Sequence, residues 1–230
     1  MNLLEGLNPE QKQAVLHTEG PLLILAGAGS GKTRVLTHRM AYLVEDKGIR
    51  PWNILAITFT NKAAREMKDR LEQLIGPDAN NIWAGTFHAS CVRILRRDID
   101  RLGYDKSFVI YDADDQQTVV KSCLEQLRIN DKNFPPRAVL NEIGRAKDEL
   151  IGPAEFKRLY ASDYRLSTIS ALYELYQEKL KASNALDFDD IILLTIRILS
   201  NFPDVLEYYS DKFRYIMVDE YQDTNTAQYT

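Results

Sequence analysis

Eight consecutive residues near the N-terminus have the composition of a phosphate-binding loop. Residues 26–33 read Ala-Gly-Ala-Gly-Ser-Gly-Lys-Thr. Glycines allow successive backbone N–H groups to point inward around phosphate oxygens, and a helix N-terminus adds partial positive charge. Lys32 would reach the β- and γ-phosphates and the Thr33 hydroxyl would ligate Mg²⁺. The predicted phosphate-binding residues are Ala26, Gly27, Ala28, Gly29, Ser30, Gly31, Lys32 and Thr33. The alternative, a flexible glycine-rich turn, is disfavoured because strand and helix patterns flank the loop.

An acidic pair, Asp219-Glu220, directly follows the apolar run 213–218. A carboxylate at the carboxyl end of a strand beside a phosphate loop faces the nucleotide crevice of an open α/β sheet. Asp219 would then hold the Mg²⁺ shell, and Glu220 could orient and deprotonate an attacking water. By itself such a pair is usually a solvated turn. Together with the glycine loop it predicts hydrolysis rather than nucleotide binding alone.

Apolar runs and helical patterns alternate around these groups. Short apolar runs at 21–25, 54–59, 82–86 and 213–218 predict buried strands, and amphipathic stretches between them predict helices, with Asn61 a possible cap. This alternation predicts an α/β fold whose parallel sheet is flanked by helices.

The pattern changes over residues 112–185, where helical periodicity dominates and Pro-Pro and Gly-Pro pairs separate the helices. This predicts an all-helical subdomain inserted into the α/β domain. The expected division is residues 1–111 with 186–230 for the α/β domain, and 112–185 for the insertion.

Composition restricts the class of protein. The 230 residues are 45% hydrophobic and 27% charged, which is ordinary for a globular chain. Two cysteines are too few for a disulfide scaffold. The sequence has no signal-peptide pattern and no apolar run long enough to span a bilayer. We therefore expect a cytoplasmic protein. The net charge is −4, which argues against purely electrostatic binding to nucleic acid but permits a local groove.

Six motifs occur in chain order and resemble those of superfamily 1 DNA helicases of the PcrA/UvrD/Rep type. They are LNPEQKQAV (7–15), AGAGSGKT (26–33), ITFTNKAAREM (57–67), GTFHA (85–89), LDFDD (186–190) and VDEYQDTN (218–225). The resemblance implies a recA-like P-loop domain with a helical accessory subdomain, and ATP and Mg²⁺ as cofactors. It further implies 3′-to-5′ movement on single-stranded DNA, unwinding at duplex junctions in repair or replication, and docking on repair or transcription proteins.

The resemblance also assigns roles to individual positions. Gln11 resembles an adenine-reading glutamine, Arg34 would lie along the nucleotide, and Gln222 resembles a glutamine that links the nucleotide site to DNA. Lys32, Glu220 and Gln222 are therefore the expected catalytic residues. The expected single-strand contacts are Phe59, Thr60, Asn61, Thr86, Phe87 and His88. From the residues alone, Phe59 is equally consistent with core packing, and a lone histidine is usually structural.

Two alternatives remain from the residues alone, a small-molecule P-loop kinase and a non-enzymatic nucleotide- or protein-binding module. The helicase resemblance also implies a second domain, so the chain is expected to be a C-terminally truncated fragment. By itself the fragment is expected to bind nucleotide weakly and to be nearly inactive, because an arginine finger contributes about 10³–10⁵ in rate where one is used.

Overall fold

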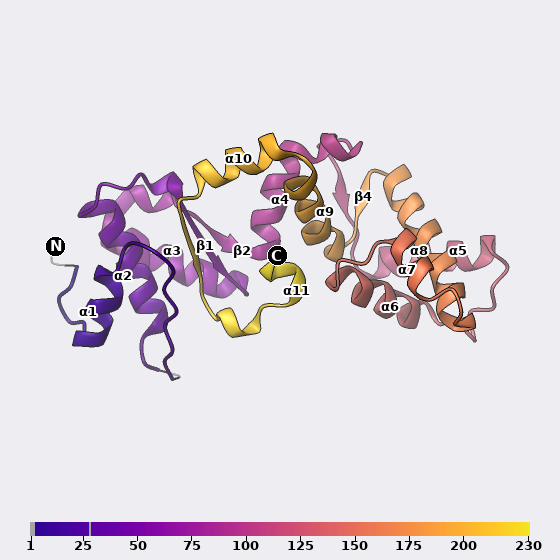
Figure 1. The fold of residues 1–230 in the computed structure, drawn as a ribbon, viewed down its shortest axis with the longest axis horizontal. Coiled ribbons are helices and arrows are strands. Elements are labelled where there is room, and N and C mark those ends of the chain that lie inside the picture. The colour runs from indigo at the N-terminus through magenta and orange to yellow at the C-terminus, as the bar shows by residue number, and fades with distance from the viewer. Residues whose placement is uncertain (1–2, 28) are drawn as a thin grey trace. The chain divides into compact units, whose positions relative to one another are not determined.

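The computed structural model describes residues 3–27 and 29–230 and has a mixed α/β architecture (Figure 1). The chain packs as two compact units. Unit 1 comprises Met1–Ser90 and Leu206–Asp223, and unit 2 comprises Cys91–Val205 and Thr224–Thr230. All of residues 112–185 fall within unit 2. The assignment of residues 1–111 with 186–230 to an ATP-binding α/β domain, and of residues 112–185 to an accessory subdomain, stays a prediction.

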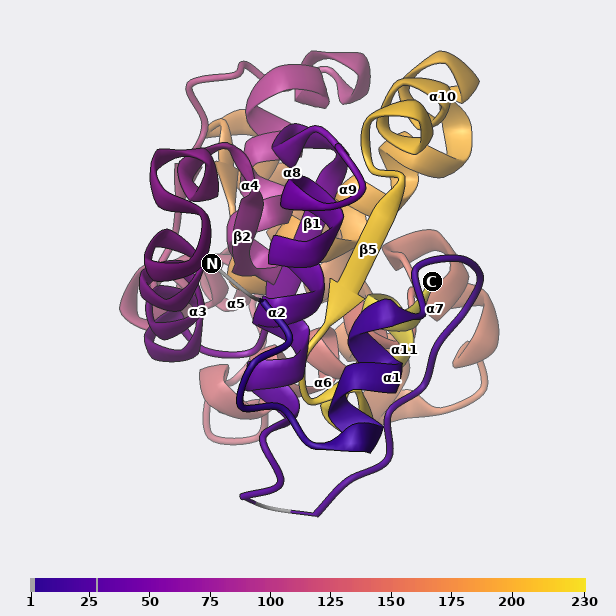
Figure 2. The ribbon, with the colours of Figure 1, turned by 90° about the vertical axis from the view of Figure 1, so that its left-hand side faces the viewer.

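Unit 1 is built on a small parallel sheet. Its strands β1 (Ile54–Thr58), β2 (Trp83–Thr86) and β5 (Tyr215–Val218) lie in the order β2-β1-β5, with β1 in the middle (Figure 2). All five residues of β1 are buried, as a central parallel strand requires. The predicted parallel sheet is therefore confirmed, and the runs at 54–59, 82–86 and 213–218 supply its strands.

The expected strand at residues 21–25 is wrong. This segment has no strand assignment, and Leu23 and Leu25 are 66% and 86% exposed. It faces residues 216–218 of β5 across a cavity of about 720 Å³. An apolar run becomes a strand only when its backbone reaches a hydrogen-bonding neighbour, and the cavity separates this run from the edge of the sheet.

The helices of unit 1 cover the sheet and position the loops. They are α1 (Pro9–Leu16), α2 (Lys32–Glu45), α3 (Asn61–Ile75) and the first residues of α4 (Phe87–Asp98). Met40 and Leu43 of α2 and Met67 and Leu71 of α3 are completely buried in one core with Ile54 of β1. This packing holds the amino end of α2 near the carboxyl ends of the strands.

Unit 2 is predominantly helical. It contains α5 (Ala113–Gln126), α6 (Pro136–Asp148), α7 (Pro153–Leu159), α8 (Tyr164–Ala182), α9 (Phe188–Asn201) and α11 (Thr226–Tyr229), while α10 (Pro203–Lys212) runs from unit 2 into unit 1. Strand β3 (Val109–Ile110) pairs in parallel with β4 (Ala185–Leu186). This short ladder joins the two ends of the predicted insertion. Short 3-10 helices lie at Pro51–Asn53, Gly76–Asn81, Ile99–Leu102 and Tyr221–Asp223.

A buried ion network fixes three helices of unit 2. The Lys147 ammonium on α6 lies 2.5 Å from Asp187 Oδ2 and 2.8 Å from Asp190 Oδ1. The Tyr176 hydroxyl of α8 donates to Asp187 at 3.0 Å, and Gln177 donates to both carboxylate oxygens of Asp190. Asp187 also caps α9. Buried charges are tolerated only when paired and hydrogen-bonded in this way.

The half-buried Asp189 beside this network makes stability depend on pH. Burial raises its pKa to about 6, Asp187 and Asp148 add to the rise, and Lys147 opposes it. Between about pH 4 and 6 the folded state therefore binds a proton that the unfolded state has lost, so stability falls as pH rises through this window. Because the carboxylate is partly solvated, its contribution to the change in the free energy of unfolding is less than about 1 kcal/mol.

We expect Asp189→Asn to reduce the loss of stability between pH 5 and pH 7. Urea unfolding of wild type and variant at both pH values measures the difference. Asp131→Asn, an exposed carboxylate in the same unit, is the control and should leave the pH dependence unchanged. An equal pH dependence of stability in wild type and Asp189→Asn would contradict the assignment of this effect to Asp189.

Candidate functional site

The glycine loop ends at the amino terminus of α2. Gly31 is the N-cap residue with a φ of 87°, and Gly29 has a φ of 76°; both are left-handed values that favour glycine. No side chain caps α2, so the N–H groups of its first turn remain available to an anion. Ser30 closes the loop by bonding the Gly27 carbonyl through both its backbone N–H and its hydroxyl. Ala28 lies outside the described residues.

Lys32 and Thr33 are the first two residues of α2. The Lys32 ammonium donates to the carbonyl of Ala26 at 3.2 Å, within the loop itself. The Thr33 hydroxyl donates to Asp219 Oδ2 at 3.1 Å, across 186 residues of sequence. The structure thus brings the glycine loop and the acidic pair into direct contact, and Lys32 and Asp219 line the same cavity.

The position of Asp219 follows from the sheet. Its backbone N–H donates to the carbonyl of Ile57 at 2.9 Å, which extends the pairing of β5 with β1 by one residue. Asp219 is buried, with its carboxylate directed at Thr33. Two protein oxygens therefore sit side by side where Mg²⁺ is expected. This donor set fits Mg²⁺, which usually takes one or two protein ligands and completes its shell with water and phosphate oxygens.

Glu220 adopts an uncommon backbone conformation. Its φ is 54°, a left-handed value that non-glycine residues adopt at a cost and that is concentrated at active sites. Its N–H donates to Asp219 Oδ1 at 3.2 Å, and the side-chain amide of Gln222 donates to its carboxylate. All three residues border the cavity that contains Lys32. Hydrogen bonds with Asp219 and with Gln222 thus orient Glu220.

Gln11 reaches the glycine loop from α1. Its side chain closes a capping box with Asn8, and its amide nitrogen donates to the Ser30 carbonyl at 2.9 Å. Asn8 was not predicted as a site residue, although the Asn-x-x-Gln spacing is a recognisable capping signal. Arg34 is exposed, and its guanidinium lies against Gly6. Gln11 is therefore placed at the loop, whereas Arg34 points toward the segment before α1.

Alanine at Gly31 is expected to weaken nucleotide binding more than alanine at Gly29. Both positions have positive φ, but a Cβ at Gly31 would lie 2.9 Å from the Gln11 amide nitrogen, whereas one at Gly29 meets nothing within 4 Å. Displacing Gln11 removes its bond to Ser30, about 0.5–1.5 kcal/mol, or roughly two- to tenfold in affinity. Titration with a fluorescent ATP analogue measures this. In a Gln11→Ala background the two variants should become equivalent.

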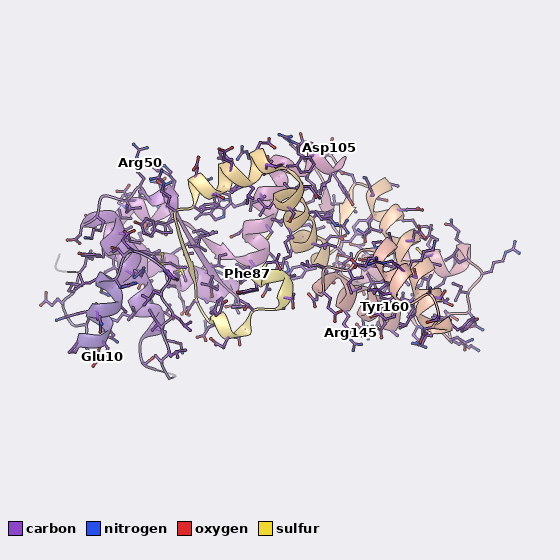
Figure 3. All side chains as sticks on the ribbon, in the orientation of Figure 1. Glu10, Arg50, Phe87, Asp105, Arg145 and Tyr160 are labelled. Carbon is purple, nitrogen blue, oxygen red and sulfur yellow. The ribbon has the colours of Figure 1, made fainter. Side chains whose placement is uncertain are left out.

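The predicted DNA contacts gather at the carboxyl ends of β1 and β2. The register pairs Thr58 with Thr86, so the segments after the two strands lie side by side. The ring centroids of Phe59 and Phe87 lie 5.5 Å apart. Phe87 is the first residue of α4 (Figure 3). Both rings are half-buried, so the packing interpretation of Phe59 is satisfied while part of each ring remains accessible.

The polar members of this group have local partners. Thr60, rather than Asn61, caps α3 by accepting from Ala63 N–H at 3.1 Å, and Thr86 accepts from Ala89 N–H at 3.2 Å. Asn61 is exposed as the first residue of α3. Burial lowers the pKa of His88, which favours the neutral ring over a phosphate-binding cation.

Two further properties concern the described residues 3–27 and 29–230. None of their helices has the length and apolar character to cross a bilayer. They also contain no group of three His, Cys, Asp or Glu side chains arranged to hold a metal ion. The candidate position for a cation that also binds phosphate is the Thr33–Asp219 pair.

Comparison with known proteins shows which family and relatives this chain is similar to. Residues 7–230 match the family model described as the UvrD/REP helicase N-terminal domain. The chain is 57% identical over 227 residues to ATP-dependent DNA helicase PcrA of Bacillus subtilis (strain 168). It is 55% identical over 228 residues to the PcrA of Staphylococcus aureus (strain Mu50), and 54% identical over 228 residues to that of Staphylococcus epidermidis. Each match covers 99% of this chain but only 31% of the relative.

Proposed function

This chain belongs to the UvrD/REP helicase N-terminal domain family, and from that membership we propose that it supplies the ATP-binding part of an ATP-dependent DNA helicase. The relatives that it matches are named ATP-dependent DNA helicase PcrA. Because the chain spans 31% of their length, the activity of a whole helicase is a proposal for it.

The contact between Thr33 and Asp219 carries the proposal. A hydroxyl at the start of a helix and a carboxylate at the end of a strand meet at 3.1 Å although they are far apart in sequence. Phosphates would bind the free N–H groups of α2, with the Lys32 ammonium exchanging the Ala26 carbonyl for phosphate oxygens. Thr33 and Asp219 would hold Mg²⁺, whose charge stabilises the phosphates during transfer.

Glu220 is the proposed general base of hydrolysis. Its carboxylate borders the same cavity as Lys32, and it accepts from the Gln222 amide. A base must be held within hydrogen-bonding reach of the water that it deprotonates. We propose that Gln222 sets the direction of this carboxylate and that Glu220 orients the attacking water.

The DNA proposal rests on the adjacent loops that follow β1 and β2. A pair of half-buried rings, Phe59 and Phe87, offers a stacking surface for unstacked bases, and aromatic stacking is worth about 1–3 kcal/mol per base. Strand β1 also pairs with β5, which precedes the acidic motif. We propose that single-stranded DNA binds here, with duplex junctions as the substrate in a cytoplasmic DNA-processing enzyme.

The kinase and binding-module alternatives are not favoured. The family match extends over residues 7–230, so it includes the helical insertion as well as the glycine loop. In a small-molecule kinase the helical insertion would act as a lid over the substrate, and the Asp219–Asp223 motif would have no role. Repair or transcription proteins remain proposed partners of the whole helicase.

We expect Mg²⁺ to tighten binding of a fluorescent ATP analogue to this chain at least tenfold relative to EDTA. Asp219→Asn should remove most of that difference, because the amide carries no charge to hold the cation. Asp223→Asn, an exposed carboxylate of the same motif, is the matched control and should retain it. Magnesium dependence that survives in Asp219→Asn, with wild-type stability, would overturn the proposed cation site.

A further inference from the structure

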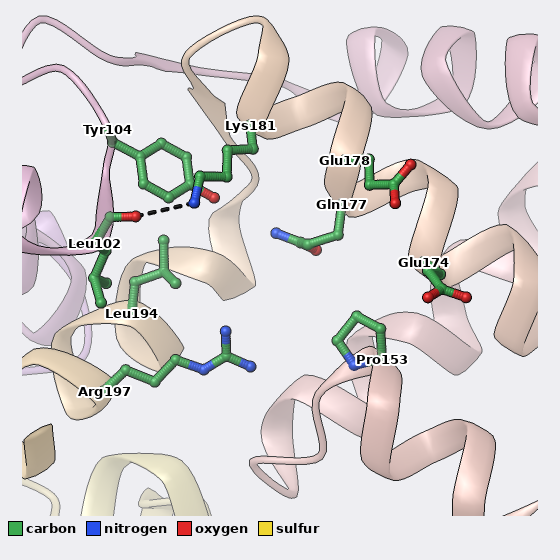
Figure 4. A pocket seen from close by; sticks show the side chains of 9 residues that line it. All are labelled: Leu102, Tyr104, Pro153, Glu174, Gln177, Glu178, Lys181, Leu194 and Arg197. Atoms are coloured by element: carbon green, nitrogen blue, oxygen red, sulfur yellow. Dashed lines mark hydrogen bonds between the residues drawn. The ribbon is translucent and has the colours of Figure 1, made fainter.

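A groove in unit 2 lies apart from the residues proposed for nucleotide and DNA binding, and it shares Gln177 with the buried ion network. It has a volume of about 360 Å³ and runs between α8 and α9, with Tyr104 and Pro153 at its ends (Figure 4). Leu102, Pro153 and Leu194 form the apolar part of its wall, and charged and amide side chains form the rest with Tyr104. Small-molecule sites usually measure about 300–1,000 Å³, so this groove suits a small ligand.

The wall of the groove contains an acceptor in a fixed orientation. The Gln177 side-chain nitrogen donates to both oxygens of the buried Asp190, at 2.9 and 3.0 Å. The amide therefore cannot rotate without losing those bonds, and its Oε1 is held on the opposite side. This oxygen is buried and has no hydrogen-bond partner among the described residues. An unsatisfied buried acceptor costs about 1–3 kcal/mol, which a donor on a ligand would recover once a small side-chain shift opened this oxygen to the groove.

Two cations occupy one end of the groove. The Arg197 guanidinium points into it (Figure 4). Within residues 3–27 and 29–230 this guanidinium makes no hydrogen bond or ion pair. It lies so close to Gly152 that a Cβ there would be 2.6 Å from a guanidinium nitrogen. The Lys181 ammonium donates to the Leu102 carbonyl at 3.0 Å and lies 5.3 Å from the centre of the Tyr104 ring. Both groups retain N–H donors for an anion.

Two carboxylates occupy the rim on the opposite side. Glu174 forms an exposed ion pair with Lys157 at 3.4 Å. Glu178, one helical turn further along α8, has no ion pair in the part of the chain that the structure describes. The groove is therefore bipolar, because a purely anionic ligand would face these carboxylates and a purely cationic one would face Arg197 and Lys181.

We propose that this groove binds a small zwitterion of the amino-acid class. The carboxylate of the ligand pairs with Arg197 and Lys181, and its ammonium donates to Gln177 Oε1 and Glu178. Arg197 presents a planar fork that matches a carboxylate. The site is independent of the nucleotide site and of the proposed helicase function.

Three glycine-based probes separate the charge requirements. Glycylglycine carries both charges, N-acetylglycine carries only the carboxylate, and glycinamide carries only the ammonium. In ¹H–¹⁵N NMR titrations of the 230-residue chain, glycylglycine should produce saturable shifts at the Gln177 side-chain amide and the Arg197 Nε–H. The singly charged probes should bind at least tenfold more weakly. No saturable shift up to 50 mM glycylglycine, or equal binding of all three probes, would overturn the proposal.

Variants test whether the shifts arise in this groove. Arg197→Gln should weaken glycylglycine binding at least tenfold, and the exposed Glu178→Gln should weaken it several-fold without affecting folding. Arg165→Gln, which removes an exposed arginine elsewhere on α8, is the control and should bind as wild type does. Unchanged affinity in both single variants, Glu178→Gln and Arg197→Gln, would contradict the assignment of the shifts to this groove.

Discussion

Replacing Lys147 by alanine is expected to lower the free energy of unfolding by about 3–5 kcal/mol. The ammonium is completely buried and is the cation shared by Asp187 and Asp190. Removing it leaves two carboxylates in a buried site, and Tyr176 and Gln177 cannot neutralise them. Chemical denaturation followed by circular dichroism measures the change, which should appear in the transition of unit 2.

A matched exposed lysine separates this effect from a general loss of charge. Lys157→Ala removes a solvent-exposed pair with Glu174, and such pairs contribute about 0–1 kcal/mol. The Lys147→Ala variant should also become more stable as pH falls, because burial already raises the pKa of Asp190 and the loss of its cation raises it further. A loss below 1 kcal/mol for Lys147→Ala would show that the ion pair is not buried in solution.

Replacing Lys32 by alanine is expected to weaken ATP binding by about 10- to 150-fold. A charge-assisted hydrogen bond is worth about 1.5–3 kcal/mol, and each 1.4 kcal/mol is a factor of ten. Lys32 lines the same cavity as Asp219 and Glu220, and among the described residues its ammonium is bonded only to a loop carbonyl that phosphate oxygens can replace. Titration with a fluorescent ATP analogue measures the affinity.

The control for this prediction is Lys12→Ala. Lys12 is exposed on α1 in the same unit, so its removal changes the net charge equally without touching the loop. The stability of Lys32→Ala should match wild type, because the Lys32 ammonium makes one exposed hydrogen bond within residues 3–27 and 29–230. A change in affinity of less than threefold for Lys32→Ala would exclude this loop as the phosphate site.

Local chemistry explains which parts of the fold were predictable. The apolar runs at 54–59, 82–86 and 213–218 became strands because each pairs with a neighbour in the sheet, although Ile216 of β5 is 61% exposed. The equally apolar run at 21–25 did not, because hydrogen bonding to a neighbour is a property of the whole sheet. Hydrophobicity predicts that a segment prefers burial, but it does not supply a partner.

The buried ion network of Lys147, Asp187 and Asp190 also shows that local sequence patterns do not reveal partners distant in the chain. The spacing of Asp187 and Asp190 is a capping-box signal that can be read locally, and the structure shows that box at the start of α9. Their partner Lys147 lies on another helix, 40 residues before Asp187, and no local pattern marks a lysine for burial. The groove containing Arg197 was likewise absent from the sequence-based prediction.

By itself the sequence determined the glycine loop, the acidic motif and most of the elements that carry them, because turns, caps and periodic burial depend on residues close in the chain. Only the tertiary structure decided that Thr33 meets Asp219, that Lys147 is enclosed by carboxylates, and that Gln177 keeps a free acceptor. Those contacts join residues distant in sequence. They exist because the β1–β5 pairing and the packing of α6, α8 and α9 bring the side chains together.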